Sequence, residues 1–297
     1  AAFLFDHLRN SSEKPANVSR YLHHVARYGE DAIIPPLSSW VLAGREQAGR
    51  KLDLIKDVQQ GLQERGAATP AELRTAADSI VAGFLAGKNV NQIKRGIAAV
   101  GEFQLRESIP RLESVFTRAG LPNDLRTSAL AAVAALDMPL GLEKLKKALD
   151  DGTLPPSLRE ATAVALANID RPEARAAVLG SLATTPEKIQ STAAAALVRR
   201  KAGAADLLEA ISSGKASARL LQQRPIVIGL ENAGIPDVGD RIAKLLAGLP
   251  PADAQVRDLL IQRRGGFEKA AGDPIAGAKT FEVRCGVCHQ VEGRGAK

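Results

Sequence analysis

The residues with the clearest chemistry lie near the end of the sequence, in the stretch FEVRCGVCHQVEGRGAK. Cys285 and Cys288 are the only two cysteines, and His289 follows them directly. Two thiols at this spacing can form thioether bonds to the vinyl groups of a porphyrin, and the next imidazole can bind the iron as proximal ligand. The pattern therefore predicts covalent haem c, with Cys285 and Cys288 as attachment points and His289 as the iron ligand.

Two other chemistries share part of this pattern. The three residues could bind zinc, but a structural zinc site needs a fourth ligand, and an adjacent cysteine and histidine suit one tetrahedral ion poorly. A thioredoxin-like C-x-x-C motif usually follows a strand in a βαβ unit, whereas the residues before Cys285 predict a helix. Because both cysteines of the chain fall in the motif, a chance occurrence is disfavoured, and haem c is the leading interpretation.

The segment before the motif contains a helix-start signal. Asp273 is a typical N-cap residue, and Pro274 suits the first helical position. We expect a helix from 274 to about 284 that ends at the first cysteine. We also expect residues 273 to 297 to form only this helix and a loose tail, without a folded haem pocket, because no candidate sixth iron ligand follows His289.

An internal repeat with a period of about 31 to 33 residues dominates the middle of the chain. Its segments share apolar or small residues at helical spacing, which predicts a helix in each. They are NQIKRGIAAVGEFQ (91–104), DLRTSALAAVAALD (124–137), SLREATAVALANID (157–170) and KIQSTAAAALVRRK (188–201). The residue after the first apolar anchor is polar, as at Arg126, Arg159 and Gln190.

A second helix is predicted after each of these segments, over 105–120, 139–152, 171–185 and 203–214. Pro139 and Pro172 lie near helix starts, where the missing N–H is tolerated. Pro110 falls inside its segment and should kink the helix or mark its true start. We expect left-handed backbone just past the helix ends, at the glycines Gly120, Gly152 and Gly214.

Paired helices of this length resemble HEAT repeats, which stack because no single pair can bury its apolar face. The fold class that we predict is all-α: a HEAT-like α-solenoid over residues 71–270, with a pattern that weakens after 220. An N-terminal helical cap or linker region is expected over 1–70. Residues 273–297 would form the start of an incomplete cytochrome c domain.

The C-terminal stretch itself resembles the first helix and haem loop of a class I cytochrome c. Gly277 and Phe281 match the small and aromatic positions of that helix, and Gly293 and Gly295 match the turn after the histidine. The resemblance covers about 25 residues. The G-P-x-L turn, the distal methionine loop and the final helix of that family have no counterpart in this sequence.

Helical repeats that lead into a C-x-x-C-H motif are similar to the C-terminal half of the PVC-type haem-binding CxxCH-domain proteins. Residues 7–29 look like the linker helices that follow a β-propeller in that family. The resemblance implies electron transfer from a dehydrogenase domain or redox protein to a respiratory acceptor, in the periplasm or elsewhere outside the cytoplasm. Any substrate-oxidising site would lie in the propeller of a sugar- or alcohol-type dehydrogenase, so this chain is not expected to be catalytic by itself.

Composition narrows the remaining classes of function. Hydrophobic residues make up 45% of the chain but aromatic residues only 3%, which is typical of closely packed small-residue helices. The 40 basic residues exceed the 33 acidic ones only mildly and form no long run, so nucleic-acid binding is not expected. No apolar stretch approaches the roughly 18 to 20 residues that span a bilayer. The sequence starts without methionine, and we expect it to be a piece of a longer exported protein.

The remaining candidate residues are better explained by structure than by chemistry. His23 and His24 are adjacent on a predicted helix, so their side chains diverge and do not favour a shared metal. His7 and Met138 are assigned structural roles, and Trp40 is predicted in a loop after two prolines. The alternative function is a repeat scaffold without a redox role, which would bind a protein partner on its concave face.

Overall fold

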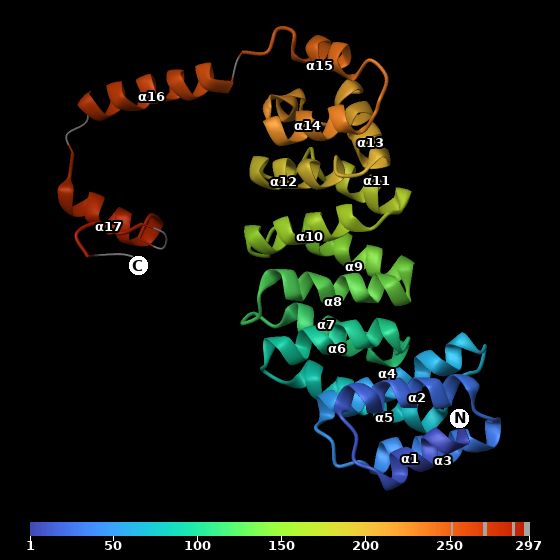
Figure 1. The fold of residues 1–297 in the computed structure, drawn as a ribbon. Helices are drawn as coiled ribbons and strands as arrows, with labels where there is room; N and C mark the ends of the chain where they lie inside the picture. The colour runs from blue at the N-terminus through green and yellow to red at the C-terminus, as the bar shows by residue number, and fades with distance from the viewer. Residues whose placement is uncertain (251, 270–271, 287–288, 294–297) are drawn as a thin grey trace.

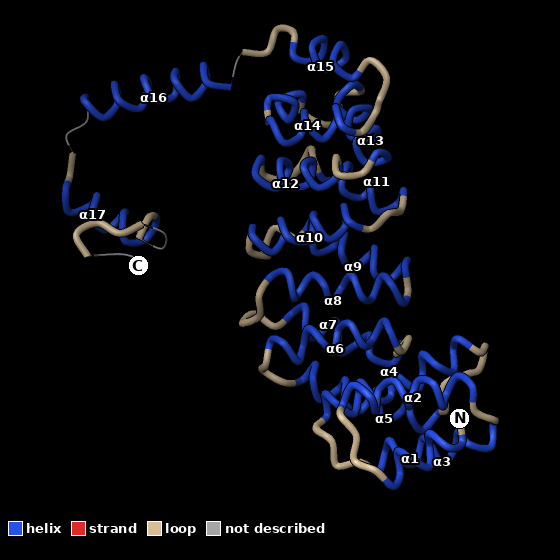
Figure 2. Tube along the Cα trace, viewed as in Figure 1, coloured by secondary structure: helices blue, strands red, loops and turns tan. Residues whose placement is uncertain are grey.

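The computed structural model describes residues 1–250, 252–269, 272–286 and 289–293. This part of the chain is all-α, as predicted, with 17 α-helices and no β-strand (Figure 2). Three short 3₁₀ helices, η1 (Asp31–Ile33), η2 (Arg106–Ser108) and η3 (Ala218–Gln222), lie between them. No helix in the described ranges is long and apolar enough to cross a membrane.

The N-terminal region begins with four helices, α1 (Ala2–Asn10), α2 (Pro15–Tyr28), α3 (Ile34–Ala43) and α4 (Ala48–Glu64). Helices α2 and α4 pack along one another. The buried apolar side chains of these helices belong to one hydrophobic cluster that continues through α5 (Ala71–Ala86) and beyond it. The helices on either side of residue 70 therefore share a core.

The first helices of the repeated segments begin at regular intervals of 33, 33 and 31 residues. They are α6 (Val90–Glu102), α8 (Asn123–Leu136), α10 (Pro156–Asn168) and α12 (Glu187–Leu197). Each one contacts the next, and α12 contacts α14 (Arg224–Asn232). These helices make one layer, which appears as a ladder in Figure 1.

The second helices of the segments form a parallel series. They are α7 (Ile109–Thr117), α9 (Met138–Asp150), α11 (Pro172–Ser181) and α13 (Lys201–Ser212). Helix α9 contacts α11, and α11 contacts α13, while α7 and α9 also contact α8 of the first layer. The result is two layers of helices with the apolar side chains between them.

Small residues allow the two layers to approach closely. A Cβ atom added to Gly141 of α9 would lie 2.2 Å from the Cα of Ala134 in α8, which is far inside van der Waals contact. Leu130 and Val133, which precede Ala134 in α8, are buried. The alanine- and glycine-rich sequence therefore has a packing role at this crossing.

The polar position noted in the repeats also has a structural role. At this position a side-chain nitrogen donates a hydrogen bond to a main-chain carbonyl at or beyond the end of the preceding second helix. The pairs are Arg126 with Phe116 (2.6 Å), Arg159 with Leu149 (2.8 Å) and Gln190 with Thr185 (2.8 Å). Phe116 and Leu149 lie in the last turn of their helices, where main-chain carbonyls lack a partner within the helix, so the next repeat supplies one.

Three local expectations can be compared with the backbone. Pro110 is the second residue of α7 and thus marks a helix start rather than a kink. Trp40 was expected in a loop, but it lies within α3, because the prolines before it occupy the first turn of that helix, where their missing N–H is tolerated. Of the three glycines expected in left-handed backbone, Gly214 has a φ of 73°, whereas Gly120 and Gly152 do not have positive φ.

The last described elements are α15 (Val238–Leu246), α16 (Ala252–Lys269) and α17 (Pro274–Arg284). Helix α15 packs against η3 and α14 at the end of the two layers. Helices α16 and α17 stand away from the stack (Figure 1). Their described side chains are exposed, apart from that of Phe281, which is partly covered.

Candidate functional site

Helix α17 positions the first residue of the C-x-x-C-H motif. The side chain of Asp273 accepts hydrogen bonds from the main-chain N–H groups of Ile275 (2.9 Å) and Ala276 (3.1 Å), as an N-cap does. Pro274 is the first helical residue and Cys285 is the C-cap residue. The predicted helix from 274 to about 284 is therefore present with its predicted start signal.

The backbone remains turned after the helix ends. The N–H groups of Cys285 and Gly286 both donate to the carbonyl oxygen of Phe281, at 2.8 and 2.7 Å. The N–H of His289 donates to the carbonyl oxygen of Cys285 at 2.8 Å. This bond brings the main chains of Cys285 and His289 within hydrogen-bonding distance of each other.

Both described members of the motif are open to solvent. Cys285 is a free, exposed cysteine, and the side chain of His289 is exposed. Cys288 lies outside the described residues. The structure therefore brings the main chains of Cys285 and His289 close together, and of the two predicted attachment thiols it describes only that of Cys285.

The residues after the histidine form a turn. Glu292 has a φ of 49° and Gly293 a φ of 82°, so both adopt left-handed backbone. Gly293 was predicted in such a turn, and Gly295 lies outside the described residues. In the described part of 272–293 only Phe281 and Gly286 are less than exposed, so the described residues form no closed pocket around His289.

The donor set suits a haem c group on chemical grounds. An exposed thiol can react with a vinyl group, and an exposed imidazole can offer a ring nitrogen to iron. The main-chain hydrogen bond between His289 and Cys285 keeps these two residues close together. Cys285 and His289 therefore fit the attachment and ligand roles that the sequence predicts for them.

The other histidines have ordinary structural partners. His23 Nε2 lies 3.0 Å from an Oε atom of Glu64, whereas the ring of His24 packs against Tyr28 with 4.8 Å between centroids. His7 Nε2 lies 2.8 Å from Glu13. His23 and His24 thus face different neighbours, and the described residues hold no group of three or more His, Cys, Asp or Glu side chains that could bind a metal ion.

Comparisons of the chain with protein-family models, with curated proteins and with solved structures found no match. The motif and its local geometry therefore carry the functional argument.

Proposed function

We propose that the chain carries one covalently bound c-type haem and takes part in electron transfer. The observation that supports this most directly is the geometry of the motif. Cys285 is the C-cap residue of helix α17 and is exposed, and His289, which is also exposed, donates a main-chain hydrogen bond to it. The sequence supplies the second thiol, Cys288, at the spacing that haem attachment requires.

Each residue has a distinct role in this proposal. Cys285 and Cys288 form the two thioether bonds, and a ring nitrogen of His289 binds the iron as proximal ligand. The haem supplies reversible one-electron chemistry when bound. The capped helix α17 leads directly to Cys285, and the main-chain hydrogen bond from His289 to Cys285 keeps the two residues close together.

The stacked helix pairs would serve as the scaffold for this group. Their spacing of 31 to 33 residues and their two-layer packing favour a HEAT-like solenoid. On the resemblance described above, the full-length protein would be exported to the periplasm or the cell surface. A dehydrogenase domain or redox protein would supply the electrons, and a respiratory partner would accept them.

A spectroscopic experiment tests the role of the histidine. The chain is produced together with haem c maturation enzymes, and its visible spectrum is recorded in oxidised and dithionite-reduced form. We expect c-type absorption bands that change reversibly on reduction. In His289→Ala these bands should lie at different wavelengths, because the iron has lost its proximal ligand. Identical spectra for the unsubstituted chain and His289→Ala would rule out His289 as the iron ligand.

A second function, protein binding on a redox-inactive scaffold, is favoured by one other feature. A groove of about 470 Å³ runs between α8 and α10 and is lined mainly by small apolar side chains, such as Ala131, Val164 and Ala165. The two functions differ in their dependence on the thiols. Replacement of both cysteines by serine would leave a pure scaffold function intact, whereas it would abolish haem-dependent electron transfer.

A further inference from the structure

Gly286 directly follows the first attachment cysteine and is the one buried residue in the described part of 272–293. Its N–H donates a 2.7 Å hydrogen bond to the carbonyl oxygen of Phe281, in the last turn of α17. Because glycine has no side chain, it is the main chain itself that is covered here. Gly286 therefore lies directly on the end of the helix.

A side chain at this position would meet the main chain of α17. A Cβ atom added to Gly286 would lie 3.1 Å from the carbonyl oxygen of Glu282, 3.3 Å from its Cα atom and 3.4 Å from the carbonyl oxygen of Phe281. These distances are shorter than the roughly 3.5 to 4.0 Å at which non-bonded carbon atoms attract best. Main-chain atoms cannot rotate away as the tip of a flexible side chain can, so the residue at 286 would have to move.

The other described glycines of this segment are not confined in this way. Added Cβ atoms at Gly272, Gly277 and Gly293 would each meet no atom within 4 Å. Gly293 needs its freedom for a different reason, because its φ is 82°. Within the described part of 272–293, close contact with the helix is thus particular to Gly286.

The contact of Gly286 with the helix is linked to the place of His289 by hydrogen bonds. Cys285 and Gly286 both donate to the carbonyl oxygen of Phe281, and His289 donates to that of Cys285 at 2.8 Å. Gly286 is the first residue of the connection from Cys285 to His289. A shift of Gly286 away from Glu282 would weaken its own bond to Phe281 and displace the chain that carries the histidine.

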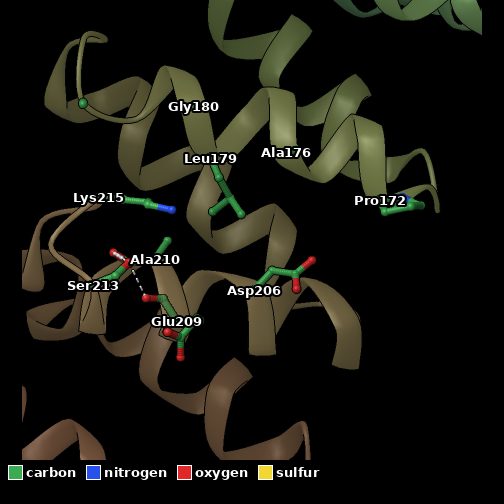
Figure 3. A pocket seen from close by; sticks show the side chains of 10 residues that line it. Pro172, Ala176, Leu179, Gly180, Asp206, Glu209, Ala210, Ser213 and Lys215 are labelled. Atoms are coloured by element: carbon green, nitrogen blue, oxygen red, sulfur yellow. Dashed lines mark hydrogen bonds between the residues drawn. The ribbon is translucent and has the colours of Figure 1, made fainter.

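The helix stack offers no wall that could hold this connection instead. Its groove of about 630 Å³ between α11 and α13 is lined by residues from 172 to 215, so the described residues of 272–293 take no part in it. Figure 3 shows Leu179 extending into this groove. Asp206 at its edge is paired with Arg175 at 2.6 Å. The place of His289 relative to Cys285 therefore depends on contacts within its own segment.

We propose that Gly286 is a positioning residue for the haem. Its missing side chain lets the connection between the cysteines pack on α17, which keeps the imidazole of His289 near Cys285 and near the iron of a haem bound there. The motif C-x-x-C-H leaves the residue at 286 open, so the need for glycine comes from this packing. The inference rests on the proposed function, because it concerns the same site.

The haem-free chain provides the first test. Gly286→Ala adds the Cβ atom alone, and Gly286→Val adds two further carbon atoms. We expect the main-chain amide of His289 to exchange with deuterium at least about threefold faster in Gly286→Val, the scale of one lost hydrogen bond, with a smaller change in Gly286→Ala. Gly272→Val is the matched control and should leave this rate unchanged. An unchanged rate in Gly286→Val would overturn the proposal.

The visible spectrum of the haem-loaded chain provides the second test. We expect the absorption bands of loaded Gly286→Val to move from those of the unsubstituted chain toward those of His289→Ala. Gly286→Ala should lie between them, and Gly272→Val should keep the unsubstituted spectrum. A role confined to the stability of α17 would not move bands that report on the iron ligand. The unsubstituted spectrum in fully loaded Gly286→Val would contradict the positioning role.

Failure of this inference and failure of the proposed function give different results. An unsubstituted chain that takes up no haem, beside a loaded control cytochrome, would remove both. An unsubstituted chain that takes up haem, with Gly286→Val indistinguishable from Gly272→Val, would remove the positioning role alone. If Gly286→Val alone takes up no haem, faster exchange at His289 supports the proposal, whereas an unchanged exchange rate overturns it.

Discussion

The side chain of Arg159 closes the end of the preceding helix through Leu149. Its Nε donates a 2.8 Å hydrogen bond to the main-chain oxygen of Leu149, in the last turn of α9. Arg126 makes the same contact with Phe116 in the repeat before it. The stack is therefore joined by polar contacts from one helix pair to the next as well as by its apolar core.

Removal of the Arg159 contact should destabilise the stack. Arg159→Met keeps an unbranched apolar chain but leaves the Leu149 carbonyl without its charged donor, which should lower the free energy of unfolding by about 1–3 kcal/mol. Urea unfolding followed by circular dichroism measures the change. Arg171→Met is the matched control, because Arg171 is exposed and has no side-chain partner in the described part of the protein. Equal effects of the two substitutions would contradict the capping role.

The close approach of α8 and α9 predicts an unusual cost for a single methyl group. Gly141→Ala would place its Cβ atom 2.2 Å from the Cα of Ala134, so the helices must separate, at a cost of about 1–3 kcal/mol. Gly101→Ala, in α6, meets no atom within 4 Å and should be neutral or stabilising by up to about 1 kcal/mol. Thermal unfolding of both variants decides this. A stable Gly141→Ala variant would mean that the crossing is looser than described.

Glu64 should stabilise the contact between α2 and α4 above acidic pH. Burial raises its pKa, but the 3.0 Å contact with His23 Nε2 and the charges of His23 and Arg27 outweigh this effect and hold the pKa below its usual 4.5. The folded state therefore favours the carboxylate. The resulting stability is present above the unfolded pKa and is lost as the pH falls through the lower, folded pKa.

Glu64→Gln should thus be less stable than the parent near neutral pH and should lose this difference as the pH falls to about 3. Denaturant unfolding can be followed through Trp40, the only tryptophan, which is half-buried against the N-terminal cluster. Glu30→Gln, at an exposed residue, serves as control. A pH-independent difference between Glu64→Gln and the parent would rule out the ionic contribution.

Asp57 of α4 should show the opposite behaviour. Burial is the largest influence and raises its pKa above the usual 3.8, although Ser19, Arg50 and His23 oppose the shift. Its contribution to stability is therefore full below the unfolded pKa and is lost as the pH rises through the raised, folded pKa. Asp57→Asn should be more stable than the parent near neutral pH and similar to it at about pH 3. Denaturant unfolding at both pH values measures this, and a destabilised variant at neutral pH would refute it.

Much of the helical framework could be predicted from the sequence because its signals are local. The four repeated first helices begin within one residue of the segments that periodicity identifies, and Asp273 with Pro274 marks the start of α17. Trp40 was misplaced because two adjacent prolines were taken to break structure, whereas their position in the first turn of α3 is compatible with a helix.

The contacts between repeats could not be predicted in the same way. Arg126 and Arg159 were recognisable as a recurring polar position, but their carbonyl partners lie ten residues earlier, across a turn whose geometry the sequence pattern does not specify. The candidate site differs again, because C-x-x-C-H indicates its chemistry through spacing alone. The exposure of Cys285 and His289 and the hydrogen bond between their main chains required the structure.

The central claim is that Cys285 and Cys288 bind haem covalently, and intact-mass spectrometry of the denatured chain tests it most directly. The chain is produced with haem c maturation enzymes, beside a known c-type cytochrome as a positive control. We predict that the parent gains the mass of one haem, and that the variant with both cysteines replaced by serine gains none. An unmodified parent chain, in a preparation where the control cytochrome is fully loaded, would contradict the account.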